Sequence, residues 1–150
     1  MKLISAQFAA CAAVLVLATA AHAGEKKLMH CFAFTSIKEA TPAQWDAFFK
    51  ATDDMPNKIK GVTKVWYGKL AAPLSQYQVT VDPETRKKMT AGETVKGDIK
   101  RVTRDWGVCM EMADEAARKA YGNDPYHKVW TDAYSKVRVE GTTTFDFVGQ

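Results

Sequence analysis

The chain has 150 residues and a formal net charge of +4, and 47% of its residues are hydrophobic. This length is enough for one domain with a hydrophobic core. The lysines and arginines are scattered along the chain rather than gathered on one motif. The sequence therefore predicts no nucleic acid as a partner.

The first 23 residues have the pattern of a secretory signal peptide. Lys2 supplies a positive start, an apolar run follows from Phe8 to Ala18, and Ala21-His22-Ala23 has the small-x-small form of a cleavage site. The apolar run is too short for a membrane anchor. We therefore expect cleavage after Ala23 and a single mature domain of residues 24–150. We expect this domain to be periplasmic or secreted, with no membrane association after cleavage.

The mature chain opens with a predicted strand at Leu28–Thr35, in which alternate side chains share a face. His30, Phe32 and Phe34 lie on one face, and Cys31 lies on the other. Thr41 can cap a helix after this strand, with a proline at its first position and a glutamine that completes a capping box. The buried face of this helix is predicted from residues at helical spacing: Trp45, Phe48, Phe49 and Thr52. Met55-Pro56 is expected to end the helix.

Two further strands are predicted on either side of a long connection. Val62–Gly68 forms the second strand, because its content favours a strand over a helix. Lys69–Thr103 is interrupted by prolines and glycines and is predicted as a long loop with one extra strand or short helix. Asp105–Met112 forms the third strand. Its alternation gives two faces, with Trp106, Val108 and Met110 on one and Cys109 and Glu111 on the other.

A pair of helices is predicted around the segment from Tyr121 to His127. Asp114 can cap a helix that ends at Tyr121, before a Gly-Asn break. Asp124 can cap the next helix, and a proline occupies that helix's first position. The second helix has an apolar face at helical spacing: Tyr126, Val129, Trp130, Ala133, Tyr134 and Val137.

His127 falls in the first turn of the second helix, where backbone N–H groups have no internal partner. Their positive field disfavours imidazolium, so we expect a neutral histidine at neutral pH. With the hydroxyl of Tyr121 nearby, His127 and Tyr121 are candidate catalytic residues, as an acid/base pair. The alternative is a structural pair bonded to each other. His30 is either a core residue or a ligand contact.

The order of elements predicts an α+β, ferredoxin-like βαββαβ fold, with a four-stranded antiparallel sheet and helices on one face. Gly141 closes a turn before the last strand, Thr142–Val148, which carries Phe145 and Phe147 on one face. The sheet face away from the helices remains uncovered and partly apolar. This favours a homodimer that forms through that face.

Cys31 and Cys109 lie on the same predicted sheet face, in strands that the fold makes neighbours. In an oxidising compartment they either form a disulfide or act as small buried hydrophobic residues. The sequence has no C-x-x-C pair and no His/Cys cluster at zinc spacing. We therefore expect no metal and no cofactor.

Several motifs together resemble the stress-responsive α/β-barrel (Dabb) domain, a family of the dimeric α+β barrel superfamily. The matching segments are Met29-His30-Cys31-Phe32, Met55-Pro56 through Ile59, Gly61-Val62, Gly68, Trp106 to Met112, Tyr121-x3-Pro125-x-His127 and Phe145-Asp146-Phe147. The resemblance covers Leu28 to Val148, except for about Ala71 to Val102. It implies a homodimer in which two four-stranded sheets close into a barrel.

One branch of this family consists of plant polyketide cyclases that work without a cofactor. The resemblance matches their catalytic tyrosine and histidine to Tyr121 and His127, and a pocket histidine to His30. Trp106 stands where these enzymes have another pocket histidine, and a tryptophan there fills space between sheet and helices. Trp106 and Trp130 are candidate ligand contacts with His30, or they fill the site.

Three hypotheses of function follow. The first is an exported homodimer that binds a small apolar or aromatic molecule or serves in stress tolerance, without assigned chemistry. The second is a cofactor-independent cyclase, lyase or monooxygenase-like enzyme that uses His127 and Tyr121. The third is a structural or assembly protein. An open pocket beside His127 and His30 favours the first two, and a site filled by Trp106 and Trp130 favours the third.

Overall fold

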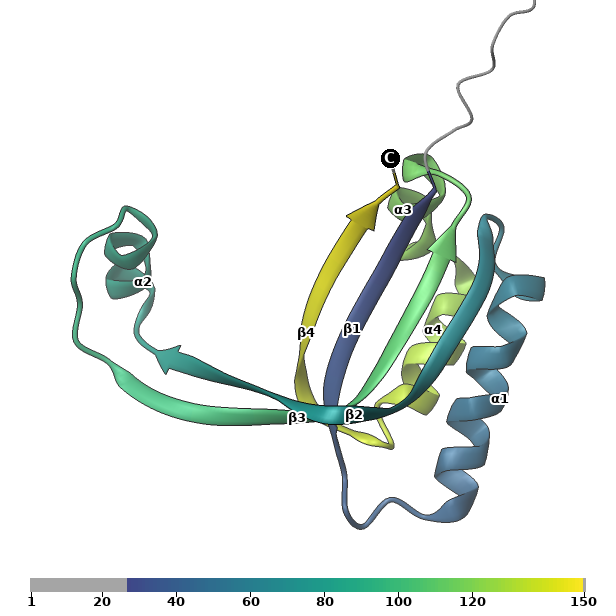
Figure 1. The fold of residues 1–150 in the computed structure, drawn as a ribbon, viewed down its shortest axis with the longest axis horizontal. Coiled ribbons are helices and arrows are strands. Elements are labelled where there is room, and N and C mark those ends of the chain that lie inside the picture. The colour runs from purple at the N-terminus through teal and green to yellow at the C-terminus, as the bar shows by residue number, and fades with distance from the viewer. Residues whose placement is uncertain (1–26, 150) are drawn as a thin grey trace, which may run out of the picture.

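The computed structural model describes residues 27–149, so the predicted signal peptide lies outside the described residues. Figure 1 shows a curved sheet with helices behind it and a long hairpin that leaves its lower end. In chain order the elements are β1 (Leu28–Ser36), α1 (Pro42–Lys58), β2 (Val62–Thr80), α2 (Pro83–Thr90), β3 (Asp98–Met112), α3 (Glu115–Tyr121), α4 (Pro125–Tyr134) and β4 (Arg138–Val148). None of the helices within residues 27–149 is long and apolar enough to cross a membrane.

The four strands form one antiparallel sheet in the order β2-β3-β1-β4. Helices α1 and α4 pack on one face of this sheet (Figure 1). This arrangement confirms the predicted α+β, ferredoxin-like βαββαβ fold with helices on one face.

Aromatic side chains fill the space between the sheet and the helices. Phe34 of β1 is fully buried and meets Phe48 of α1 edge-on, with ring centroids 5.9 Å apart. Tyr134 of α4 packs against the same phenylalanine of β1, with centroids 5.0 Å apart. Each such side chain contributes about 1.5–3 kcal/mol by leaving water. The predicted N-terminal cap of α1 is present, because the Thr41 hydroxyl accepts the Gln44 N–H and the Gln44 side chain bonds back to the Thr41 N–H.

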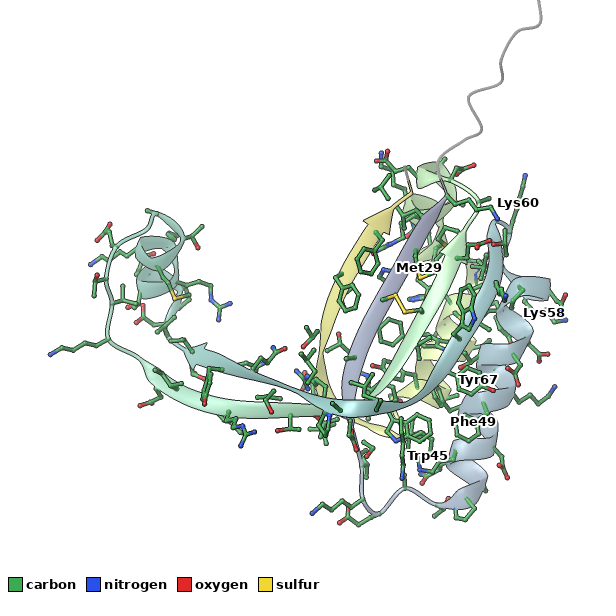
Figure 2. The ribbon with its side chains drawn as sticks, in the orientation of Figure 1. Met29, Trp45, Phe49, Lys58, Lys60 and Tyr67 are labelled. Carbon is green, nitrogen blue, oxygen red and sulfur yellow. A yellow bond between two sulfur atoms is a disulfide. The ribbon has the colours of Figure 1, made fainter. Side chains whose placement is uncertain are left out.

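The opposite sheet face is uncovered by helices, and we call it the open face. It includes Met29, Cys31 and Ala33 of β1, Trp66 of β2, Gly107, Cys109 and Glu111 of β3, and Phe145 and Phe147 of β4, as strand pairing and alternation require. Cys31 lies opposite Cys109 in the ladder, and the two are joined in a disulfide, visible beside Met29 in Figure 2. Trp66, Phe145 and Phe147 are 40%, 43% and 60% exposed.

The prediction that Met55-Pro56 ends the first helix is wrong. Helix α1 continues through Pro56 to Lys58, and the Ile59 N–H closes it by donating to the Met55 carbonyl at 2.9 Å. A proline removes one backbone hydrogen bond of a helix. Met55 and Ile59 are almost fully buried, so their packing holds the last turn in place.

In Lys69–Thr103 the predicted short helix is present as α2, but the predicted long loop is wrong, as are the predicted end of the second strand and the start of the third. The two strands continue as a paired ribbon from Leu74↔Arg104 to Thr80↔Asp98, with α2 between them. We call residues 74–103 the arm. Its side chains are mainly polar or exposed, so no one-sided apolar pattern marks these strands in the sequence.

Two boundaries near the C-terminus also differ from the predictions. Helix α4 ends at Tyr134 rather than Val137, although Val137 is fully buried just beyond it. Strand β4 begins at Arg138 rather than Thr142. Gly141 lies inside this strand with φ +89°, at the place where the pairing with β1 shifts register. This conformation favours glycine and accommodates the irregularity in the ladder.

Candidate functional site

The segment from Tyr121 to His127 folds as its sequence predicts. Tyr121 ends α3, and α4 begins at Pro125. The carboxylate of Asp124 caps α4 by accepting the Tyr126 N–H at 2.8 Å. This cap fixes the direction of α4 and turns His127 back toward Tyr121.

Tyr121 and His127 meet through their rings. The ring centroids lie 4.5 Å apart with an interplanar angle of 75°, an edge-to-face contact. Within residues 27–149 no hydrogen bond joins the Tyr121 hydroxyl to the imidazole of His127. The alternative prediction, a structural pair bonded to each other, is therefore not formed as a direct hydrogen bond. Tyr121 is only 4% exposed, and burial raises the pKa of its hydroxyl well above the usual value. The phenol is therefore protonated at neutral pH and is available as a proton donor.

His30 of β1 joins this pair from the sheet. Its ring centroid lies 5.9 Å from that of Tyr121. Its Nδ1 lies 2.5 Å from Oδ1 of Asp146 in β4. The other carboxylate oxygen, Oδ2, forms an ion pair with Nε of Arg118 at 3.3 Å. Asp146 thus connects the buried histidine to Arg118 of α3.

Burial lowers the pKa of His30, and the nearby Arg118 charge acts in the same direction, against the raising effect of Asp146. Burial acts to raise the pKa of Asp146, but the hydrogen bond with His30 and the charge of Arg118 outweigh it and the net shift is downward. At neutral pH the site therefore holds a neutral imidazole beside a carboxylate. A carboxylate only accepts hydrogen bonds, so the proton of His30 sits on Nδ1 and Nε2 keeps a free lone pair.

The pKa of His127 is also lowered, first by burial and then by the charges of His30 and Arg118, against the effect of Asp124. The direction agrees with the neutral histidine expected from the sequence. The leading cause differs from the expected one, because burial rather than the helix end comes first.

The two candidate tryptophans lie in different places. Trp130 is buried beside His127, with ring centroids 5.9 Å apart, and its indole N–H donates to the Thr52 hydroxyl at 3.0 Å. Trp106 instead packs against Trp45 of α1, with ring centroids 4.5 Å apart. Trp106 belongs to a partly exposed aromatic cluster with Trp45, Phe49 and Tyr67, the last three labelled in Figure 2. The structure thus brings His30, Tyr121, His127 and Trp130 together and leaves Trp106 outside this group.

Sequence reasoning missed Asp146 and Arg118. Asp146 stands between Phe145 and Phe147, so strand alternation places it on the helix-covered face. That signal was present, but the pairing of Asp146 with His30 depends on the register between β1 and β4, which the sequence does not fix. No group of His, Cys, Asp and Glu within residues 27–149 is arranged to hold a metal ion.

No family model matches the chain, and no curated protein matches its sequence. A Dabb family protein from Mesorhizobium loti with a ferredoxin-like fold matches with a TM-score of 0.53 and 18% identity, over 84% of this chain and 99% of its own. A dimeric ferredoxin-like protein of unknown function from Thermobifida fusca matches with a TM-score of 0.53 and 14% identity, over 83% of this chain and 92% of its own. Hydroxynitrile lyase from Passiflora edulis matches with a TM-score of 0.55 and 9% identity, over 85% of this chain and 95% of its own.

The chain has a Dabb-like, ferredoxin-like fold. The resemblance proposed from the sequence is thereby confirmed at the level of the fold.

Two hollows open on either side of α3 in this Dabb-like fold. One, of about 730 Å³, is lined by Leu28, Val148, Asp146, Arg118 and neighbouring residues of α3. The other, of about 720 Å³, is lined by Gly61, the alanines of α3 and Tyr121. The first exposes the carboxylate that holds His30, and the second reaches Tyr121. Of the clustered candidate residues, Tyr121 lines the second hollow, whereas His30, His127 and Trp130 line neither hollow.

Proposed function

We propose that the protein binds a small apolar or aromatic molecule in the hollow beside α3. The observation that carries this proposal is the position of Asp146. Its carboxylate holds buried His30 on one side and lines the hollow on the other. A ligand there meets apolar surface from Leu28 and Val148 and a charged pair, Asp146 and Arg118, and three more charged residues border the hollow, Asp114, Glu115 and Lys119. Pockets that combine apolar walls with a few fixed polar groups are typical of small-molecule sites.

A ligand-observed NMR screen of small aromatic and apolar molecules tests this proposal. We expect hits whose binding is lost in Ala116→Trp, because Ala116 lines the hollow and a tryptophan there fills it. Ala91→Trp, at the tip of the arm, is the matched control and should retain binding. Hits that bind both variants equally, or a screen without hits, would contradict the proposal.

A second candidate function is cofactor-independent proton transfer of the lyase or cyclase kind. The observation that favours it is the hydrogen bond from His30 to Asp146, which leaves Nε2 of a neutral imidazole as a base, with the protonated phenol of Tyr121 next to it. One solved structure of similar fold is a hydroxynitrile lyase. The chemistry needs a substrate with an acidic C–H beside a carbonyl or a similar activating group.

Hydrogen–deuterium exchange at that carbon, followed by NMR in D₂O with carbonyl-containing hits of the screen, tests the second candidate. Wild type should accelerate the exchange, and His30→Gln and His127→Gln should each abolish it. Lys88→Gln, at an exposed position of α2 in the arm, should leave the rate unchanged. Exchange no faster with protein than in buffer would exclude proton abstraction from these molecules.

We further propose that the working form is a homodimer through the open face. The exposed Trp66, Phe145 and Phe147 support this, and a solved structure of similar fold is described as dimeric. Sedimentation of the mature domain should give a dimer, and Phe147→Glu should give a monomer. Tyr77→Glu, which changes an even more exposed aromatic residue on the arm, should remain dimeric. A monomeric wild type would contradict this part of the proposal.

Export to the periplasm or the exterior completes the proposal. The Cys31–Cys109 disulfide supports it, because such bonds persist in oxidising compartments. Mass spectrometry of the protein recovered after expression with its own N-terminus should give a mature chain that begins at Gly24. An intact chain retained in the cytoplasm would contradict export.

A further inference from the structure

Arg104 is a buried arginine at the root of the arm. It is 1% exposed, although arginine is among the residues least often buried. Its Nη1 donates to the Thr35 hydroxyl at 3.1 Å, and its Nε donates to the Thr143 hydroxyl at 3.4 Å. Both threonine hydroxyls donate hydrogen bonds to neutral oxygens: Thr35 to the Thr103 carbonyl and Thr143 to the Gln76 side chain. The whole network around the guanidinium is therefore uncharged.

No carboxylate among residues 27–149 forms a salt bridge with Arg104. Asp105, its neighbour in the chain, is engaged by the Ser36 backbone N–H and hydroxyl. A buried charge without a counter-ion is costly, since neutral hydroxyls replace only part of its hydration. The second terminal nitrogen, Nη2, has no hydrogen bond within the described residues and lies beside Gly141, where an added Cβ would be 3.6 Å away.

A hollow of about 300 Å³ opens at this position, between the arm and the first part of β4. Three basic side chains line it, Arg104, Lys100 and Arg101, against one acidic side chain, Glu140. Arg101 is already bonded to the Ser75 hydroxyl at 2.9 Å, while Lys100 forms no salt bridge among the described residues. The hydroxyl of Thr35 and the amide of Gln78 add neutral hydrogen-bonding groups to the wall.

We propose that this hollow is an oxyanion site, in which Arg104 and Lys100 bind a carboxylate or phosphate group. The planar guanidinium presents parallel N–H donors that match two oxygens of such a group. The anion supplies the charge that Arg104 lacks within the protein. The site is separate from the hollow beside α3 and does not depend on its ligand.

Isothermal titration of the mature domain with inorganic phosphate, and separately with succinate, tests this site at constant ionic strength in chloride. We expect one anion per chain with a dissociation constant of about 1 mM or lower. Arg104→Gln should weaken binding at least about tenfold, and Lys100→Gln about threefold or more. Lys96→Gln, an arm lysine outside the hollow, is the matched control and should bind as wild type does. Preference for phosphate or for succinate tells which oxyanion the site is built for.

Glu140→Gln separates the proposal from a purely structural role for Arg104. If the hollow binds anions, removing the one acidic group of its wall tightens phosphate or succinate binding by a few fold. If Glu140 is the counter-ion of Arg104 in solution, the same substitution destabilises the fold and wild type shows no saturable binding. Since Glu140 and Lys100 are exposed, both variants should fold even if Arg104→Gln does not. Absence of saturable binding by wild type, or unchanged binding by Lys100→Gln, would overturn the proposal.

Discussion

Strands β2 and β3 run through both the body of the protein and its arm, but different contacts hold them in place in the two regions. In the body, β2 and β3 rest on helices and enclose a core in which Phe34, Phe48 and Met110 are fully buried. In the arm, the same strands pair only with each other, and no residue of 74–103 is buried. Isolated two-stranded ribbons are marginally stable in water. Backbone pairing between β2 and β3 therefore determines the conformation of the arm, whereas the stability of the domain comes from the body.

The sharpest test of this contrast substitutes one large aromatic residue in each region. Phe48→Ala should lower the free energy of unfolding by about 3–5 kcal/mol, because it leaves a cavity in the core. Tyr77→Ala, at a side chain 73% exposed on the arm, should change it by less than about 0.5 kcal/mol. Urea unfolding of both variants measures the difference. Similar losses of unfolding free energy in the two variants would show that the arm is stabilised by packing contacts as the body is.

The disulfide is the second feature that separates body from arm, because it lies in the body and closes a loop that contains α1 and the whole arm. Its sequence separation is 78 residues. Removing it with Cys31→Ala and Cys109→Ala together should cost about 2–4 kcal/mol, largely by freeing the unfolded chain. Unfolding with and without reductant gives the comparison, and the double variant should be insensitive to reductant. An unchanged midpoint in the double variant would show that the body does not need the bond.

The pH dependence of stability should also come from the body, since His30 and His127 both lie there with lowered pKa values. A histidine whose pKa is lower in the folded state binds fewer protons folded than unfolded. The stability linked to its neutral form is therefore complete above the unfolded value of about 6.5 and is lost as pH falls through the lower, folded value. Unfolding between pH 7.5 and 5 should show this loss, and His30→Gln should flatten it. A profile unchanged by the substitution would assign the dependence to other groups.

Excision of the whole arm should have only a small effect on stability. Replacing residues 76–102 with Asn-Gly joins Ser75 and Thr103, which pair in the ladder, through a turn that suits a hairpin. The free energy of unfolding should fall by no more than about 1 kcal/mol, because loop length affects stability only weakly. The phosphate binding proposed for Arg104 should weaken sharply in the same variant, because Lys100 and Arg101 are removed. A large loss of stability would make the arm part of the folding unit.

The parts of the molecule that the sequence could predict are those with a one-sided apolar pattern or a local cap. Thr41, Asp114 and Asp124 all cap helices where expected, and β1 alternates as expected. The arm could not be predicted, because its strands bury neither face. Pro56 gave a false end to α1, since tertiary packing of the last turn outweighs the loss of one hydrogen bond.

Only the part of the candidate site that depends on local sequence patterns could be predicted. Tyr121 and His127 are joined by a short, well-marked turn, and His30 was placed on the helix-covered face by alternation. The pairing of His30 with Asp146, and the ion pair of Asp146 with Arg118, join residues more than 25 positions apart in the chain. Such contacts follow from strand register and helix placement, which no local pattern encodes.

The most direct test of the central claim, that the body binds a small molecule beside α3, is chemical-shift mapping. The ¹H–¹⁵N spectrum of the mature domain should be recorded with and without a hit of the screen. We predict that the shifted resonances gather at Leu28, Arg118, Asp146 and Val148, with the arm unaffected. Shifts confined to the open face or to the arm, with the resonances around Asp146 unchanged, would contradict it.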